Sequence, residues 1–297
     1  MNLAHATSTR CSTTRSYPSI RAEPPRRCGS ARALLTIAAL ATWTTTNAVA
    51  RAAPVNADDG AAEDGSRSAQ LAARDGMALP NQMAARMEPK QRVVAVGLAG
   101  YDAATATGIA RMVADVNIFG PLDLRAGLTY LSDVGPYQNK FEPQLGLRLR
   151  LLNQETAGID LATAVLYRRD RYTQDAGLVQ AVLAVGRRWG RLGVLGNVAF
   201  GSDLEGDDRD GELGVALLYE AALQLQVGLE SHVRLDLGSN DPRRQLRGQG
   251  AYDLQAGPVV HCAIGPAIFT AETGFSAYQF EHTRTGVYAL GGLAGVY

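Results

Sequence analysis

The chain has 297 residues and carries 29 Lys+Arg against 29 Asp+Glu, so its formal net charge is zero. This balance argues against a nucleic-acid partner, which usually requires a basic excess. Hydrophobic residues make up 46% of the sequence, a share that fits neither a bundle of membrane helices nor a disordered chain. The cysteines are Cys11, Cys28 and Cys262, too few for a disulfide framework.

The first fifty residues have the order of an export signal. Arginines precede the apolar run ALLTIAALA at 33–41, and a small-x-small site ends at Ala50. The run is too short to span a bilayer. We predict a cleaved signal peptide over 1–50, against the alternative of a tail with a chance apolar patch. Residues 51–91 are rich in Ala, Asp, Arg and Ser, which predicts a largely disordered periplasmic linker.

From Arg92 onward, segments with the character of β-strands follow one another to the last residue. We predict twelve strands, in chain order over 92–101, 109–119, 122–131, 144–152, 158–168, 177–189, 191–201, 212–220, 223–237, 251–265, 267–278 and 285–297.

Apolar and polar residues alternate along these segments. In 223–237, every second residue from Leu223 is apolar except Ser231, and polar or charged residues and a glycine stand between them. In 144–151, four leucines alternate with Gln, Gly and Arg. Period-2 alternation places the two sets on opposite faces of a strand. The run of fifteen residues is long enough for a tilted strand to cross a membrane, which takes about 9–11 residues.

The connections between the segments alternate between long and short. The long ones are 102–108, 132–143, 169–176, 202–211, 238–250 and 279–284, and the short ones are 120–121, 153–157, 190, 221–222 and 266. An even number of strands then puts all short turns and both chain ends at one end of the sheet. Short periplasmic turns and longer external loops are typical of outer-membrane barrels. A soluble sandwich also alternates, but it does not predict this regularity.

On this pattern, residues 92–297 resemble bacterial outer-membrane β-barrel proteins, most simply a small porin-like barrel. The resemblance implies an all-β fold: a closed, antiparallel, up-and-down transmembrane barrel of about twelve strands in contact with outer-membrane lipid. It also implies that the terminal aromatic residue, Tyr297, is recognised by the barrel-assembly machinery through the last strand. Glycines at 291, 292 and 295 depart from the usual bulky ending. Aromatic residues near strand ends suit interfacial girdles. They are Tyr101, Phe119, Tyr130, Tyr167, Trp189, Tyr219, Tyr252 and Tyr278.

The alternation also predicts which charges face the lumen. Near the short-turn end these are Asp123, Arg125, Arg148, Arg150, Asp160, Arg188, Arg191 and Glu220. Farther along lie Asp115, Glu230, His232 and Glu272, and near the outer rim Arg168, Glu212, Arg234, Asp236 and Asp253. These charges either pair with one another and stiffen a narrow barrel, or form a constriction that selects solutes. The surplus of arginine near the short-turn end predicts a weak anion preference if the lumen is open.

No pattern in the sequence indicates catalysis. Ser231 faces outward and its neighbour His232 inward, so the two form no dyad on a regular strand. We find neither clustered histidines nor a Gly-x-Ser-x-Gly motif. We therefore expect no enzymatic activity, metal or cofactor, and a narrow pore or transporter for small solutes of unknown identity. The alternatives are a lipid- or lipopolysaccharide-modifying enzyme and a closed structural or surface-binding barrel.

Two local features allow further expectations. The acidic segment 202–212 is expected to be a solvated loop, with calcium binding as the alternative. Gly257 and Pro258 interrupt a strand and predict a β-bulge.

Overall fold

The computed structural model describes residues 93–132, 140–169, 177–204, 208–239, 252–279 and 283–296, together with Leu79 and Met83. The expected signal peptide, most of the expected linker and Tyr297 lie outside the described residues. None of the described residues belongs to a helix long and apolar enough to cross a bilayer.

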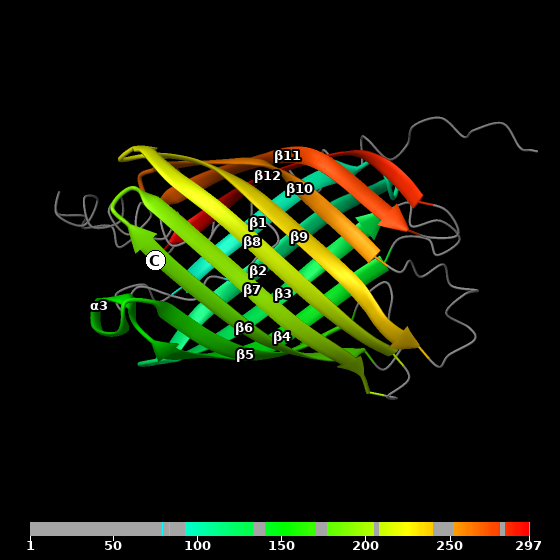
Figure 1. Ribbon diagram of the computed structural model, residues 1–297, viewed down its shortest axis with the longest axis horizontal. Helices are drawn as coiled ribbons and strands as arrows, with labels where there is room; N and C mark the ends of the chain where they lie inside the picture. The colour runs from blue at the N-terminus through cyan, green and yellow to red at the C-terminus, as the bar shows by residue number, and fades with distance from the viewer. Residues whose placement is uncertain are drawn as a thin grey trace, which may run out of the picture.

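The described chain forms one closed barrel in which every strand pairs antiparallel with its neighbours in sequence, and the first strand pairs with the last (Figure 1). This confirms the predicted twelve-stranded, all-antiparallel architecture. The strands are β1 (Val93–Asp102), β2 (Thr107–Phe119), β3 (Leu122–Ser132), β4 (Lys140–Leu152), β5 (Asp160–Arg168), β6 (Leu178–Trp189), β7 (Leu192–Asp203), β8 (Asp208–Ala222), β9 (Leu225–Ser239), β10 (Tyr252–Ile264), β11 (Ala267–Gln279) and β12 (Thr283–Val296); one short helix, α3 (Gln154–Ala157), lies between β4 and β5.

The alternation in sequence becomes an inner and an outer face. In β6, burial alternates residue by residue from Leu178 to Arg187: Val182 is buried inside, and Leu183 is 47% exposed on the outside. Every one of the twelve strands exposes at least one large apolar side chain, with the largest numbers on β4 and β9 and a single one each on β1, β3 and β12. Such a surface is stable in lipid, where a sheet must close on itself to pair every backbone group.

The two-residue turns lie at one end of the barrel, here called the short-turn end, and the opposite end is the loop end. The short turns are Gly120–Pro121, Gly190–Arg191, Leu223–Gln224 and Gly265–Pro266. Each of the three glycines is the first turn residue and has a positive φ, of 48°, 57° and 57° in chain order. A type II′ hairpin turn needs glycine at this position. The fifth short connection, at 153–159, contains α3.

Several predicted boundaries were wrong. Residues 221–222, predicted as a turn, form the last two residues of β8. The turn is Leu223–Gln224, because Ala222 pairs with Leu225. The expected acidic loop 202–212 is largely strand, because β7 continues to Asp203 and β8 begins at Asp208. The expected long connection at 102–108 is a four-residue turn over 103–106.

The predicted bulge at Gly257–Pro258 was also wrong. The pairs Ala256↔Phe275 and Val259↔Glu272 keep one register across the site. A Cβ on Gly257 would lie 2.0 Å from the carbonyl oxygen of Thr273 and 2.6 Å from the Cα of Gly274. Glycine at 257 therefore allows the backbones of β10 and β11 to approach closely. Pro258, which has no backbone N–H, is accommodated without the additional strand residue that a bulge would insert.

Aromatic side chains are exposed near both ends of the strands. Phe119, Trp189 and Tyr219 lie toward the short-turn end, and Tyr101 and Tyr167 lie toward the loop end. The Arg187 guanidinium carbon lies 4.9 Å from the centre of the Trp189 ring. Two such belts are the arrangement expected at the two membrane interfaces.

Depth in the membrane predicts the cost of a charge on the outer face. Leu183→Arg, at the middle of β6, should lower the free energy of unfolding by about 2–4 kcal/mol, whereas Leu192→Arg, at the first residue of β7, should cost about 0–1 kcal/mol. Both side chains face outward, at 47% and 38% exposure. Urea unfolding of the barrel refolded in lipid vesicles measures both values. Equal costs would contradict a membrane-spanning outer face.

The positions of the turns predict the orientation in the cell. A protease-sensitive tag inserted at 205–207, between β7 and β8, should be cut on intact cells, because the loop end is external in barrels of this kind. The same tag inserted at 155–156, in α3, should be cut only after the outer membrane is permeabilised. The reverse pattern of cleavage would overturn this orientation.

Candidate functional site: the barrel lumen

The inner wall formed by β2, β3 and β4 carries a paired charge network. Arg148, which is 1% exposed, lies 2.9 Å from a carboxylate oxygen of Asp123 and 3.9 Å from one of Asp115. Arg125 lies 3.4 Å from Asp115, and the Asn117 amide donates to Asp123 at 2.7 Å. A buried charge is tolerated where it is paired and hydrogen-bonded. This part of the predicted lumen charge is therefore largely neutralised within the wall.

A second group of charges joins strands that are not neighbours. Arg168, at the end of β5, forms an ion pair with Glu212 of β8 and lies 3.6 Å from Asp210, so its side chain reaches past β6 and β7. His232 lies 3.5 Å from Glu212, and Arg234 lies 2.5 Å from Asp210. We call Arg168, Asp210, Glu212, His232 and Arg234 the constriction layer.

The sequence around the layer explains how it fits. A Cβ on Gly201 of β7 would lie 2.1 Å from a carboxylate oxygen of Asp210. The glycine therefore leaves space through which the carboxylate meets the two arginines. Asp210 belonged only to the expected acidic loop, and the structure places it on β8, where it is buried. Glu212, expected both in this loop and among the lumen charges of the outer rim, belongs to the same strand.

Two cavities border the constriction layer. A cavity of about 120 Å³ extends toward the loop end, where Glu142, Asp253 and Gln255 contribute to its wall. A cavity of about 90 Å³ lies deeper, and Leu166 and Val182 contribute to its wall. Both cavities are lined by residues of the layer and by Arg111 and Gln144. Spaces of this size hold a few water molecules, so the lumen is narrow at this depth.

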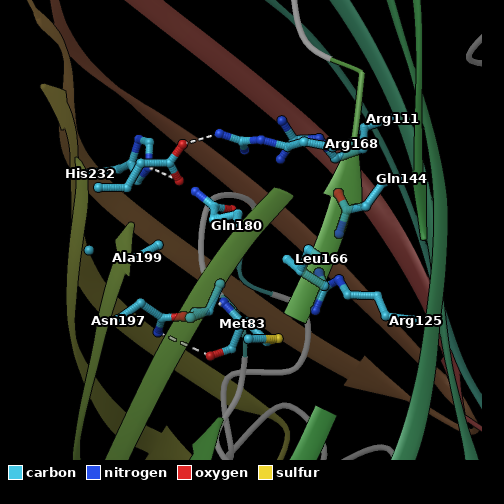
Figure 2. A pocket seen from close by; sticks show the side chains of 13 residues that line it. Met83, Arg111, Arg125, Gln144, Leu166, Arg168, Gln180, Asn197, Ala199 and His232 are labelled. Carbon is cyan, nitrogen blue, oxygen red and sulfur yellow. Dashed lines mark hydrogen bonds and ion pairs between the residues drawn. The ribbon is translucent and has the colours of Figure 1, made fainter. Parts of the chain in front are cut away.

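The floor of the deeper cavity is formed by a residue that precedes the barrel in sequence. Figure 2 shows Met83 beside Asn197, on the side away from Arg168 and His232. The Met83 N–H donates to the Asn197 side-chain oxygen at 3.1 Å, and the Asn197 amide donates to the Met83 carbonyl at 3.0 Å. One amide side chain thus satisfies both backbone groups of Met83.

Leu79 and Met83 both pack against apolar side chains on the inner wall. Met83 lies against Ala164, Leu166, Val182, Ala184 and Ala199, and Leu79 against Leu195, Ala216, Leu218 and Val259. We call these nine wall residues the inner apolar stripe. Leu79 is 4% exposed and Met83 is 5% exposed. Burial of each side chain contributes about 1.5–3 kcal/mol, before the entropic cost of ordering the segment.

The inner apolar stripe departs from the alternation of apolar and polar residues that was used to predict the lumen charges. A signal for it exists in the sequence, because both faces of 160–168 and 178–185 are apolar over several residues. A strand that is apolar on both faces meets lipid on one side and needs an apolar partner on the other. The expected linker supplies that partner through two of its residues.

The remaining predicted site residues lie in different surroundings. Arg188 lies 3.2 Å from Glu220, and Asp160 accepts from the backbone N–H of Gln154 at 2.8 Å. Arg150 donates to the Gly120 carbonyl at 2.9 Å. Arg191 lies exposed in the two-residue turn between β6 and β7.

Toward the loop end and on the β9–β12 wall, carboxylates are engaged locally. Glu230 and Glu272 are buried, and Glu272 accepts a hydrogen bond from the Tyr288 hydroxyl. Asp236 accepts from the Gly238 N–H at 2.9 Å. Asp102 was not among the predicted residues, yet it accepts from Gln255 at 2.9 Å and from Ser276 at 2.8 Å.

The candidates for catalysis are dispersed. The Nδ1 atom of His261 lies 2.9 Å from the Thr270 hydroxyl inside the barrel, and His232 belongs to the constriction layer. Cys262 is a free cysteine. Within the described ranges, no group of three or more His, Cys, Asp or Glu side chains is arranged to hold a metal ion.

No protein-family model matches the sequence, and no match is found among curated proteins. Solved structures with similar folds include the NanC porin, with 8% identity, a TM-score of 0.49, and 68% of this chain aligned with 99% of that one. The KdgM porin in complex with disordered oligogalacturonate has 7% identity, a TM-score of 0.46 and coverages of 69% and 99%. LpxR from Salmonella typhimurium has 10% identity, a TM-score of 0.42 and coverages of 69% and 100%.

Sequence identities this low carry no information about individual residues of the lumen. The class of barrel is therefore identified from the strand pairing and the surfaces of this chain. The described chain combines a closed sheet of twelve antiparallel strands with apolar side chains on its outer face and charged side chains inside it. These are the features of a β-barrel of the bacterial outer membrane.

Proposed function

We propose that the barrel is a narrow pore for small solutes and that the constriction layer sets its selectivity. The observation that carries the proposal is the ion pair from Arg168 to Glu212, which reaches past two strands with a cavity on each side. Charges that only stiffened the wall would pair between neighbouring strands, as Arg148 and Asp123 do. A ring of charges at the narrowest depth is how pores discriminate between ions.

The lining of the two cavities supports a weak preference for anions. Five arginines line them, against three carboxylates among the described residues. The arginines are Arg111, Arg125, Arg168, Arg169 and Arg234, and the carboxylates are Glu142, Glu212 and Asp253. Fixed charge acts most strongly where low-dielectric walls are close together, so the local surplus matters more than charges elsewhere in the barrel. The constriction layer alone has two arginines and two carboxylates, so the surplus comes from the arginines that line the cavities beside it. The basis for the preference therefore moves from the short-turn end to these two cavities, which border the constriction layer.

We also propose that the barrel acts as a channel and not as a lipid-modifying enzyme. The support is the placement of its histidines. His232 and His261 face the lumen, where their contacts are Glu212 and Thr270, and neither lies at the outer, lipid-facing surface. Incubation of the refolded barrel with phospholipid and with lipopolysaccharide should release no product, and a specific lipid product would overturn this proposal.

The anion preference predicts the effect of removing one lumen charge. Arg111 lines both cavities, and its Nε atom donates to the Thr129 hydroxyl at 3.3 Å, a bond that glutamine can replace. Arg111→Gln should shift the reversal potential under a salt gradient toward that of a cation-preferring pore. The matched control is Arg187→Gln, which removes an exposed outer arginine beside Trp189 and should leave the potential unchanged.

Three results bear on this prediction. A pore that prefers cations before any substitution would overturn the anion preference while leaving the pore in place. A reversal potential that ignores Arg111→Gln, or that shifts equally with Arg187→Gln, would show that the charges lining the two cavities beside the constriction layer do not set selectivity.

A further inference from the structure

The inner apolar stripe is an unusual surface for the inside of a membrane barrel. Lumen walls of such barrels are polar where they meet water. Here β5–β8 and β10 contribute nine apolar residues that face inward, opposite the charged wall of β2–β4. A wall of this kind is more stable when an apolar group covers it than when it is exposed to water.

The structure shows what covers it. Leu79 and Met83, which precede β1 in sequence, occupy the two halves of the inner apolar stripe and are themselves almost wholly buried. The reciprocal hydrogen bonds between Asn197 and the Met83 backbone fix Met83 at one depth. Asn197 is a polar residue placed among apolar wall residues. Its side-chain NH2 group and its side-chain oxygen are both hydrogen-bonded to the backbone of Met83.

The position of Met83 places it in the path of a solute. It contributes to the wall of the deeper cavity, which also reaches Arg168, Glu212 and His232 of the constriction layer. A solute that passed the layer from the loop end would therefore meet Met83 next. Leu79 packs against β7, β8 and β10, so the two residues together reach several strands of the barrel.

We propose that the inner apolar stripe is the docking site of Leu79 and Met83, and that these residues plug the pore until they leave it. The proposal rests on the pore function proposed above. It assigns Asn197 as the residue that positions the plug, and it makes the open pore a state in which the inner apolar stripe is exposed to the lumen.

The first experiment records single-channel currents of the full-length chain refolded in a planar bilayer. Leu79→Asp/Met83→Asp should raise the conductance or the open time several-fold, because a carboxylate is unfavourable against the inner apolar stripe. Asn197→Ala should act in the same direction by removing both hydrogen bonds to Met83. Met83→Leu keeps an apolar side chain and should behave as the unsubstituted protein.

The matched control for Asn197→Ala is Asn117→Ala. It removes the same amide from another inward-facing strand residue, whose partners are Asp123 and the turn after β2. This variant should leave the current unchanged. A rise equal to that of Asn197→Ala would overturn the role of Asn197, because it would reflect a loosened barrel and not a displaced plug. Heat-modifiable electrophoretic mobility verifies that each variant is folded.

The second experiment tests the docked position without any current. Met83→Cys is placed in a chain whose own cysteines are replaced by alanine, and its rate of reaction with a bulky water-soluble thiol reagent is measured. The folded barrel should react far more slowly than the unfolded chain, and adding Asn197→Ala should raise the rate. A folded barrel that reacts as fast as the unfolded chain would overturn the docking site.

The outcomes separate the two proposals. If the unsubstituted protein already conducts as well as Leu79→Asp/Met83→Asp, the pore stands and the plug is overturned. If every variant stays silent although Met83→Cys becomes reactive when the segment is displaced, the proposed pore fails, and the two residues are not what closes the lumen.

Discussion

The closure of the sheet on itself is the constraint from which the rest of this structure follows. A strand edge in lipid leaves backbone groups unpaired at a cost of several kcal/mol each, and the pairing of β1 with β12 removes the last such edge. Closure with twelve strands also creates an interior. Side chains fill an eight-stranded barrel, whereas sixteen strands leave an open channel. At twelve, the wall needs something else to complete the packing on its inner side.

The chain fills the interior in two different ways. On β2–β4, arginines and carboxylates form ion pairs within the wall. These side chains fill space inside the barrel, and because opposite charges are paired, the electric field that they create in the lumen is small. On β5–β8 and β10, the wall is apolar and receives Leu79 and Met83. The constriction layer lies at the loop end of the apolar wall, because Arg168 extends from the last residue of β5 to carboxylates of β8.

The periodicity of the sequence was enough to predict the barrel but not its contents. Alternation fixes inside and outside, since a strand such as Leu225–Ser239 has one apolar face that only lipid can accept. In the structure Arg148 and Glu230 are buried, and Arg125 forms an ion pair with Asp115. Alternation could not give the ion pairs, because partners such as Arg168 and Glu212 lie 44 residues apart and three strands away in the sheet.

The errors in prediction also have physical causes. The predicted loop boundaries were wrong where charged residues continue a strand, as in β8 (Asp208–Ala222). Polar residues were interpreted as loop residues, although a strand can carry charged side chains on the face that lines the lumen. The prediction of a bulge at Gly257 was wrong because a glycine within a strand can mark either a change of register or the close approach of two backbones. At Gly257 it marks the close approach. Leu79 and Met83 were assigned to a linker because nothing local to them indicates structure. Their partners lie more than eighty residues away, and only the doubly apolar strands of the wall point to them.

The even number of strands determines how a segment inside the barrel can be withdrawn. Val93 begins β1 at the short-turn end, so the chain that holds Met83 is tethered at that mouth. Asn197, which holds Met83, is the sixth residue of β7 counted from the same mouth, or about 17 Å along the strand. The ten residue steps from Met83 to Val93 can span about 33–36 Å when extended. The tether is therefore longer than the depth, and Met83 can leave and return through this mouth with no strand unpaired.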